Sequence, residues 1–596
     1  MSLKFNPDDS LLNATWATVL LSERDVAGQV PVNFVTTSAI SLQAACFGDK
    51  TYGRSAAEKC LSNLLAVGYR RFNIDLYWSP PLRRWILCPV TVPTDVDVVT
   101  VSPSATPTAT AEVAQGTVTA ELEQSSEELL YDLGSYRCSD SLDLQDVLDI
   151  FHDYFQFTDT DLVTYSRYLT FNIHAAADPT SPDDPASTVA SGELPVESES
   201  ISYVLNNKLG GYIYGPPDLD QDRRNLNDSW YKVDDKYKPI IQYITIEEDS
   251  EGVQSTIDGW PSEKFLQLAA ERRLLVEYGS VDPQLSEYDL SVENEVIFSP
   301  GYMTTTVPVA AADDGSLDSG CLYDPGTTDV SKLNASWAIS SHIPIPQNLS
   351  DESLRFMADL VVNLTACGMT STLNQTLFGD TADTNPAPYR NLTLSSSWAW
   401  ALGQPAANPS DTDTAESDAK RCAVMDLSLD GQWRTANCSK SRRAACRIDN
   451  QPFRWSLSSQ SHSYKDANDD ACPPQTGFSV PRTGLENTYL FRHLLSLPTD
   501  QIDPFSSDPL KREVWIDFNS IDVETCWVTG GADATCPYTS DPDQLERRTV
   551  LVAAVAGIVI CIIAALTLFV KCNANRRNSR RNKRIIQGWE YEGVPS

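Results

Sequence analysis

The chain has 596 residues, of which 45 are Lys or Arg and 81 are Asp or Glu, so its formal net charge is −36. Seven of the basic and two of the acidic residues lie from Lys571 onward, which leaves 38 basic and 79 acidic residues, a balance of −41, before that point. A surface this acidic repels phosphate groups, so direct binding of DNA or RNA is excluded. The length exceeds what one hydrophobic core can organise, so we expect at least two domains.

Helices and strands alternate through the first half of the chain. Apolar residues at helical spacing precede runs with strand composition, and Gly68 marks the end of the first helix. Three such helix–strand pairs follow one another: 56–67 with 72–78, 141–157 with 162–174, and 262–272 with 273–279. This alternation predicts a parallel α/β fold, either a barrel or an open sheet.

Three stretches of low complexity interrupt this pattern. They are rich in Ser, Thr, Ala and Pro and cover residues 101–128, 175–200 and 405–420. Such a composition buries little apolar surface, so we interpret all three as surface insertions within domains.

Three segments of the α/β region resemble the phosphatidylinositol-specific phospholipase C-like barrels. They are "NLLAVGYRRFNIDLYWSPPLRRWILCPV", "LDLQDVLDIFHDYFQFTDTDLVTYSRYLTF" and "DGWPSEKFLQLAAERRLLVEYGS", and they occur in the family's order. The resemblance implies a degenerate TIM barrel over residues 15–345.

The residues that would carry out catalysis in such a barrel are missing. The family uses two histidines as acid and base, but Pro89 stands where the second is expected, and no His occurs where the first would lie. We therefore expect no catalytic residue, metal or other cofactor. The alternative is a lumenal phosphodiesterase or glycosidase, which would require Asp75, His174 and Glu277 to converge within about 6 Å.

Residues 346–540 are rich in Trp, Gly, Cys and Asn, which predicts short strands and loops held by disulfides. "SSWAWALGQP", "RCAVMDLSLDGQWRTANC" and "RRAAC" resemble the second half of a C-type lectin-like α+β domain, a resemblance that implies a Cys422–Cys438 disulfide. "WSLSSQSHSYKDANDDACPP", "FSVPRTGLENTYL" and "VWIDFNSIDVETCWV" resemble its first half. The reversed order indicates a circular permutation that pairs Cys446 with Cys472; the alternative is an unrelated disulfide-rich extension.

Calcium-dependent sugar binding is not expected in this second region. A calcium ion takes six to eight oxygen ligands. Too few side-chain oxygens are supplied by the two segments expected to bind the ion, Gln404-Pro405-Ala406 and Trp433-Arg434-Thr435. The positive charge of Arg434 would also repel a calcium ion. Calcium-independent binding of a glycan remains an alternative function.

Twelve of the 14 cysteines precede residue 549, an even number that suits an oxidising compartment. Besides the two pairs above, a local Cys526–Cys536 bridge is expected. The remaining cysteines are then combined as Cys46–Cys60, Cys88–Cys138 and Cys321–Cys367, although connectivity is not fixed by sequence. Eight Asn-x-Ser/Thr sequons also precede that point and predict N-linked glycans; they are at Asn13, Asn227, Asn334, Asn348, Asn363, Asn374, Asn391 and Asn437.

The stretch 549–570 has 22 residues without a charge, enough for one helix to cross a bilayer. Residues 571–596 form a basic tail, which favours the cytosolic side. The chain is therefore predicted to be a single-pass type I membrane protein that contacts the lipid bilayer through 549–570. Its first 21 residues lack the pattern of a signal peptide, and we expect that the sequence is missing one.

The combination of "RRFNIDLYW", "WAWALGQP", "PRTGLEN" and "VWIDFNSIDV" with one span and a basic tail resembles the fungal maintenance of telomere capping protein 6 family. The resemblance implies a single-pass type I membrane glycoprotein with an indirect role in telomere capping. We expect a non-catalytic protein of the secretory pathway, located in the endoplasmic reticulum, the vacuole or the cell surface. Its ectodomain would bind an unidentified protein partner in the lumen.

Overall fold

The structure is a computed structural model, and it describes residues 2–11, 14–94, 97–101, 117–122, 128–340, 343–344, 350–406 and 420–538. Residues 1–536 form one compact unit. The predicted span at 549–570 and the tail at 571–596 lie outside the described residues. Within the described ranges, no helix combines the length and the apolar character that crossing a bilayer requires.

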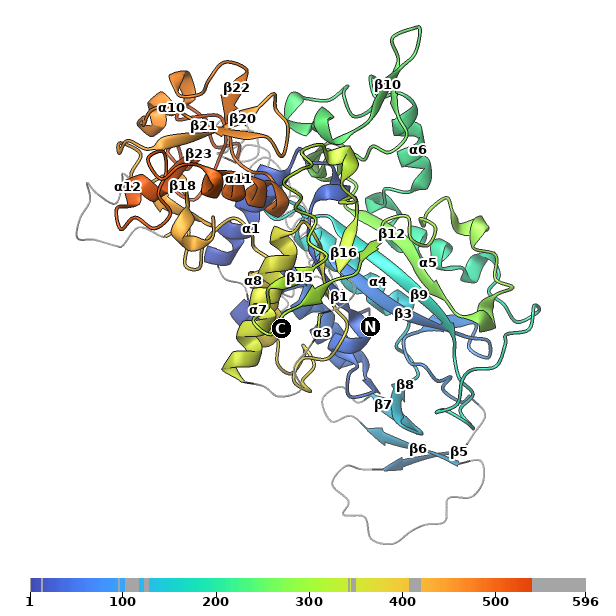
Figure 1. The fold of residues 1–596 in the computed structure, drawn as a ribbon. Coiled ribbons are helices and arrows are strands. Elements are labelled where there is room, and N and C mark those ends of the chain that lie inside the picture. Colours follow the sequence, from blue (N-terminus) through green and yellow to red (C-terminus); the bar gives the residue numbers. More distant parts are fainter. Residues whose placement is uncertain are drawn as a thin grey trace, which may run out of the picture. The chain divides into compact units, whose positions relative to one another are not determined.

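A parallel sheet forms the centre of the first region (Figure 1). Its strand order is β12-β9-β3-β1-β17, every neighbouring pair is parallel, and β4 (Arg84–Ile86) adds antiparallel to β3. The five parallel strands are β1 (Ser38–Ser41), β3 (Arg71–Ser79), β9 (Arg167–Ala175), β12 (Leu274–Val281) and β17 (Ser371–Leu373). The parallel α/β prediction is thus confirmed.

Helices cover this sheet because their apolar residues recur at helical spacing. The helix α3 (Arg54–Val67) ends at Gly68, whose φ of 104° is a left-handed conformation that glycine adopts without steric cost. The helix α4 (Leu144–Phe157) begins at Asp143, whose carboxylate accepts hydrogen bonds from the amides of Gln145 and Asp146. The other helices of this region are α1 (Ala14–Ala27), α2 (Leu42–Cys46), α5 (Ile201–Leu209), α6 (Pro216–Arg224), α7 (Asp351–Ala366) and α8 (Ala387–Ser395).

The two faces of the sheet differ in polarity. On β3, Phe72, Ile74, Leu76 and Trp78 are fully buried under the helices. The positions between them point to the other face, as the period of two in a strand requires, and Asn73, Asp75 and Tyr77 among them are only partly buried. Polar side chains from neighbouring strands therefore share one face of the sheet.

Beyond β17 the sheet continues toward a barrel. The strands β13 (Thr305–Val307) and β16 (Ala338–Ser340) pair in parallel, and Ile339 bridges to Thr370 just before β17. On the opposite edge, Glu277 of β12 bridges in parallel to Phe298. The first region is thus a partial barrel.

Two details of the first region differ from the sequence analysis. The partial barrel extends past the expected boundary at residue 345, because β17 is formed only at residues 371–373. The helix expected at 262–272 is reduced to a five-residue π-helix at Phe265–Ala269, because Ser262 bonds the Phe265 amide and Glu271 takes a φ of 55° that ends the turn.

A smaller five-stranded sheet flanks the carboxyl end of the barrel strands. It takes the order β2-β8-β7-β6-β5. Its strands are β2 (Thr51–Tyr52), β5 (Asp97–Val101), β6 (Thr117–Leu122), β7 (Leu129–Leu133) and β8 (Tyr136–Ser139). The low-complexity stretch 101–128 thus contributes β6, and Ala120 on this strand is fully buried, so this part of the predicted surface insertion packs against the fold.

The second region is built on a six-stranded, mostly antiparallel sheet of order β19-β18-β23-β20-β21, with β22 beside β20 (Figure 1). Its helices are α10 (Tyr464–Asp470), α11 (Gly484–Ser496) and α12 (Pro509–Arg512). The strands are β18 (Cys422–Asp426), β19 (Trp433–Ala436), β20 (Arg443–Ile448), β21 (Trp455–Leu457), β22 (Thr476–Phe478) and β23 (Glu513–Asn519). Two short hairpins, β10 (Ile246–Glu248) with β11 (Gln254–Thr256) and β14 (Ala310–Ala311) with β15 (Leu317–Ser319), complete the fold.

The two regions are joined by buried polar contacts. Glu23 of α1 accepts hydrogen bonds from the Ser397 hydroxyl (2.5 Å) and from the amides of Trp398 (3.0 Å) and Ala399 (3.1 Å). The Tyr243 hydroxyl donates to Glu486 of α11 over 2.6 Å. Residues more than 350 positions apart are therefore held together in one unit.

Candidate functional site

The carboxyl ends of β3 and β9 bring a polar cluster together on the partly open face of the barrel sheet. His174 Nδ1 lies 2.9 Å from Asp282 Oδ2, and His174 Nε2 lies 3.9 Å from Asp75 Oδ1. The Tyr77 ring stacks on the imidazole with centroids 4.9 Å apart. Asp75 also accepts a hydrogen bond of 2.8 Å from Asn172. We call Asp75, Tyr77, Asn172, His174 and Asp282 the barrel-mouth cluster.

Parallel register explains why these residues meet. Tyr77 lies opposite His174 and Asp75 opposite Asn172 on adjacent strands, so all four side chains share one face. Asp282 directly follows β12 and reaches His174 from the next strand along. Carboxyl ends of parallel barrel strands are the usual place for functional side chains.

The electrostatics of the cluster favour a proton on His174. Burial by itself would lower the pKa of His174, but the interactions of the imidazole with the carboxylates of Asp75 and Asp282 outweigh it and raise the pKa above its ordinary value. Burial raises the pKa of Tyr77, and the neighbouring Asp75 raises it further. The cluster therefore offers one histidine proton donor between two carboxylates.

Glu277 does not join this cluster, although the sequence analysis grouped it with Asp75 and His174. Its buried carboxylate forms an ion pair of 2.6 Å with Arg71 and accepts hydrogen bonds from the Met303 amide (2.8 Å) and the Thr304 hydroxyl. In the register Glu277 lies opposite Thr170, two residues before Asn172. The requirement that the three groups converge is not met.

Pro89 also lies beside the barrel mouth. Its carbonyl accepts a hydrogen bond of 2.8 Å from the amide of Ala177, shortly after β9. The segment after β4 thus approaches the mouth, where the resemblance expects a second histidine, but it contributes no titratable side chain at this position.

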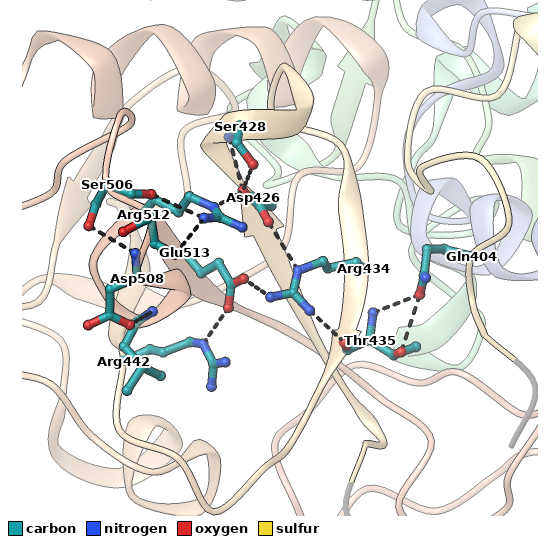
Figure 2. A network of polar contacts seen from close by, with 12 residues as sticks. Gln404, Asp426, Ser428, Arg434, Thr435, Arg442, Ser506, Asp508, Arg512 and Glu513 are labelled. Carbon is teal, nitrogen blue, oxygen red and sulfur yellow. Dashed lines mark hydrogen bonds and ion pairs between the residues drawn. The ribbon is translucent and has the colours of Figure 1, made fainter. Parts of the chain in front are cut away.

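A second polar network lies at one end of the sheet in the second region (Figure 2). Arg434 of β19 forms ion pairs with Asp426 (3.0 Å) and with Glu513. Glu513 also pairs with Arg442 (2.8 Å), and Asp426 pairs with Arg512 (3.0 Å). We call these five residues the Arg434 network.

Neighbouring loops are tied to this network. Gln404 Oε1 accepts hydrogen bonds from the amide (3.1 Å) and the hydroxyl (3.2 Å) of Thr435 (Figure 2). On the other side, Arg512 donates to the carbonyl of Ser506 over 3.1 Å. The network thus positions the loops around 404 and 506.

Every carboxylate oxygen of the Arg434 network has a cationic partner. Asp426 and Glu513 are at most 2 % exposed. Burial opposes ionisation of Asp426, but hydrogen bonds from Ser428 and from Arg512 lower the pKa of this residue overall. Burial and the neighbouring Arg434 lower the pKa of Arg442 to about 10. Three guanidinium groups occupy the oxygens that a metal ion would need, and no group of three or more His, Cys, Asp or Glu suited to a metal occurs in the described ranges.

Comparisons with known proteins identify the family. A family model described as the MTC6 partial TIM-barrel domain matches residues 11–398, which is more than half of the chain. The chain belongs to the maintenance of telomere capping protein 6 family.

Curated relatives in yeasts carry the family's name. "Maintenance of telomere capping protein 6" of Candida albicans (strain WO-1) is 24% identical over 98% of this chain and 95% of its own length. The Debaryomyces hansenii protein is 22% identical over 97% and 94%. The Saccharomyces cerevisiae (strain JAY291) protein is 26% identical over 67% of each chain. No solved structure matches the chain.

In this member of the maintenance of telomere capping protein 6 family, the cysteines of the described region form six disulfides. Those in the second region are Cys422–Cys438, Cys446–Cys472 and Cys526–Cys536. Those in the partial barrel are Cys46–Cys60, Cys88–Cys138 and Cys321–Cys367. The structure thus forms the same six pairs that the sequence analysis proposed, and the family match to residue 398 agrees with a barrel that extends past residue 345.

The sequon asparagines of this family member differ in accessibility. Asn13 and Asn348 lie outside the described residues. Asn363 and Asn437 are half-buried, and Asn363 donates a hydrogen bond to the Gly315 carbonyl. Four are exposed: Asn227, Asn334, Asn374 and Asn391. Attachment of a glycan requires an accessible amide, so these four are the best placed acceptors.

Sequence reasoning missed several residues of both sites. Asp282 follows a strand end in the segment Val-Asp-Pro, which is a usable signal for a barrel-mouth position. No such signal marks the other members of the Arg434 network, because they meet only in the folded sheet: Asp426 ends β18, Arg442 precedes β20, Arg512 ends α12 and Glu513 begins β23.

Proposed function

We propose that this chain is a single-pass type I membrane glycoprotein of the secretory pathway, with residues 2–538 in the lumen acting as a non-catalytic binding module. The observation that carries the proposal is the set of six disulfides, which uses all twelve cysteines before residue 549. Disulfides persist in oxidising compartments and are rare in the cytosol. The uncharged stretch 549–570 then supplies the anchor.

The topology is tested on the full chain in intact membranes. Alkaline carbonate should leave the protein in the membrane pellet, and digestion with PNGase F should lower its apparent mass by several glycans. Replacing Asn227, Asn334, Asn374 and Asn391 by Gln should remove most of that shift, because these asparagines are exposed. A protein that carbonate extracts, or whose mass PNGase F leaves unchanged, contradicts the lumenal assignment.

The second region supports a permuted C-type lectin-like module within this proposal. The Cys422–Cys438 disulfide joins β18 to the segment after β19, the pair that the resemblance implies. The Arg434 network takes the place of oxygen ligands for calcium at this end of the sheet. We therefore propose that this surface binds without calcium.

A protein partner is the proposed ligand of this surface. Two loops attached to the Arg434 network carry apolar side chains that are almost fully in solvent, namely Leu402 and Phe505. Exposed apolar side chains on rigid supports are suited to act as anchors in protein interfaces. The large acidic excess of the chain further favours a partner with a basic surface.

Site-specific crosslinking in the lumen tests this surface. A photoactivatable amino acid at position 402 or 505 should give a discrete protein adduct, while the same residue at the exposed Ile257, directly after β11, should give none. Substituting Arg434 by Ala should reduce both adducts, because the loops lose their support. Equal labelling at all three positions would argue against a specific surface.

We also propose that any role in telomere capping is indirect. The relatives carry that function in their name, but a lumenal, strongly acidic chain has no means of contacting chromosome ends. Chromatin immunoprecipitation of the tagged full chain should recover no telomeric DNA above an untagged control. Enrichment of telomeric DNA would overturn this part of the proposal.

A phosphodiesterase is the second candidate, and the barrel-mouth cluster is the observation that favours it. His174 with Asp282 resembles an acid–base pair held in orientation by a carboxylate. The full chain would then cleave a phosphodiester substrate, such as a glycerophosphoinositol, and His174→Ala would abolish that cleavage. We expect no cleavage by either protein, because the cluster holds one histidine where the resembled family uses two. Cleavage that His174→Ala abolishes would favour this second function.

A further inference from the structure

An apolar cavity of about 370 Å³ opens at the amino ends of β3 and β9, the opposite end of these strands from His174. It lies between the amino-terminal segment, α1, α3 and the end of α4. Its volume is at the small end of the range for ligand sites. The site is therefore separate from the barrel-mouth cluster.

The walls and rim of this cavity are hydrocarbon. Leu11, Leu20 and Leu65 contribute to the walls. At the rim, Phe157 is 64% exposed and Leu162 47%, so apolar side chains lead from solvent into the cavity. An entrance of this kind suits a flexible apolar chain better than a polar metabolite or a peptide backbone, which would lose hydrogen bonds to water.

Two arginines provide the polar end of the cavity. Arg70 is neutralised by Glu263, 3.2 Å away. Arg167 is 98% buried and donates to the Ser166 carbonyl (3.1 Å) and to the Tyr154 hydroxyl. Its Nε has no hydrogen-bond partner, and no carboxylate of the described residues lies within ion-pair distance of Arg167. This guanidinium is a buried cation without an anion.

The other arginines around Arg167 have partners of their own, and acidic groups act on each of them. Arg24 pairs with Asp25, while Arg273 bonds to the carbonyl oxygens of Phe155 and Thr158. The Tyr165 ring, which lines the cavity, lies under the guanidiniums of Arg70 (4.7 Å) and Arg167 (5.8 Å). Aromatic faces stabilise a cation only in part, so an added anion here would find a favourable field.

We propose that this cavity binds a single long-chain carboxylate, such as a fatty acid, with its carboxylate against Arg167 and Arg70 and its hydrocarbon chain directed to the rim at Phe157 and Leu162. The apolar walls account for the chain, and the uncompensated Arg167 accounts for the acid group. A guanidinium recognises a carboxylate through paired charge-assisted hydrogen bonds. A two-chain phospholipid does not fit a cavity of this volume, and a neutral lipid leaves Arg167 without an anion.

The test uses the full chain in membranes and a photoactivatable hexadecanoate that carries an alkyne for detection. After irradiation, we expect the label on peptides that contain residues 5–20 or 157–167, and we expect excess hexadecanoate to compete with it. Excess hexadecanol, which has the same chain without the acid, should compete at least tenfold less well. Label confined to 549–570, or equal competition by the alcohol, overturns the proposal.

Variants separate ligand binding from folding. Arg167→Met should reduce labelling at least tenfold, whereas Arg273→Met, a matched buried arginine that does not line the cavity, should leave it within twofold. Ala17 is exposed on α1 and lines the cavity, so Ala17→Trp should block labelling even if Arg167→Met fails to fold. Labelling that Ala17→Trp leaves unchanged in a folded protein overturns the assignment of the ligand to this cavity.

Discussion

The two polar clusters of the molecule differ in how completely their carboxylates are paired and buried. In the Arg434 network both oxygens of Asp426 and both of Glu513 face a guanidinium, and the carboxylates are out of contact with solvent. In the barrel-mouth cluster, Nε2 of His174 has no hydrogen-bond partner among the described residues, and Asp282 is partly exposed. The carboxylates of the Arg434 network are thus fully paired and support the fold, although Nη1 of Arg442 has no hydrogen-bond partner. The barrel-mouth cluster keeps bonding capacity for a ligand at His174 and Asp282.

Removal of the central carboxylate of the Arg434 network should have the largest effect on stability. Glu513→Ala would leave Arg442 buried without its anion, and loss of one partner of a buried pair costs about 3–5 kcal/mol. Urea unfolding of the disulfide-intact chain measures this loss of stability. Arg454→Ala, which removes the exposed pair with Asp449, is the control and should change stability by about 0.5 kcal/mol or less. Equal effects of the two variants would show that the network contributes no more than a surface pair.

The disulfides should stabilise the two regions by similar amounts. The double variant Cys422→Ser/Cys438→Ser opens a loop of 16 residues, for which chain entropy predicts a loss of about 3 kcal/mol. The loop closed by Cys46 and Cys60 spans 14 residues, so the corresponding variant in the partial barrel should lose a similar amount. Thermal unfolding of both variants checks this. A much larger loss in the second region would mean that its Arg434 network depends on the disulfide.

The barrel-mouth cluster should respond mainly through pH. Because the pKa of His174 is higher in the folded than in the unfolded chain, its contribution to stability is complete below pH about 6.5 and is lost as the pH rises through the folded value. His174→Gln should remove this part of the pH dependence of unfolding. Asp282→Asn should shift it to lower pH, since the imidazolium loses its nearest anion. If stability instead rises with pH above about 6.5, and does so only when His174 is present, the pKa of His174 is lowered by folding and our inference is wrong.

The smallest expected effect concerns calcium. Arg434, Arg442 and Arg512 hold the oxygens of Asp426 and Glu513, so neither calcium nor EDTA should change the melting temperature. Differential scanning fluorimetry with and without each additive measures this. A melting temperature that calcium raises and EDTA lowers would show a metal site that the described residues do not reveal.

Local patterns in the sequence were sufficient for much of the barrel. The spacing of Leu61, Leu64 and Leu65 and the stop at Gly68 located α3, and the composition of 72–78 located β3. These features depend on residues close together in the chain, which is why periodicity reveals them. The strand β17 has three residues and no pattern of its own, so its place beside β1, more than 300 positions away, could not be predicted.

The candidate sites were less accessible to prediction. Asp75 and His174 were recognised because each lies near the end of a predicted strand, but the register that separates Glu277 from them depends on pairing across β9. The sequence shows that the positive charge of Arg434 is unsuited to a calcium site. It does not show which carboxylates pair with Arg434. Asp426, Arg512 and Glu513 meet it through antiparallel pairing of β18 and β23, which no local pattern encodes.

The contact of Glu23 with the backbone at 397–399 has a consequence for biosynthesis. Helix α1 leaves the ribosome early, but the donors that hydrogen-bond the Glu23 carboxylate are made only after almost 400 residues have been translated. At about 5–20 residues per second, this delay lasts from roughly 20 s to more than a minute. During that interval the nascent chain would expose both an unpaired acid and the edge of β1 that later receives β17. Chaperones would therefore encounter this polypeptide for most of its synthesis.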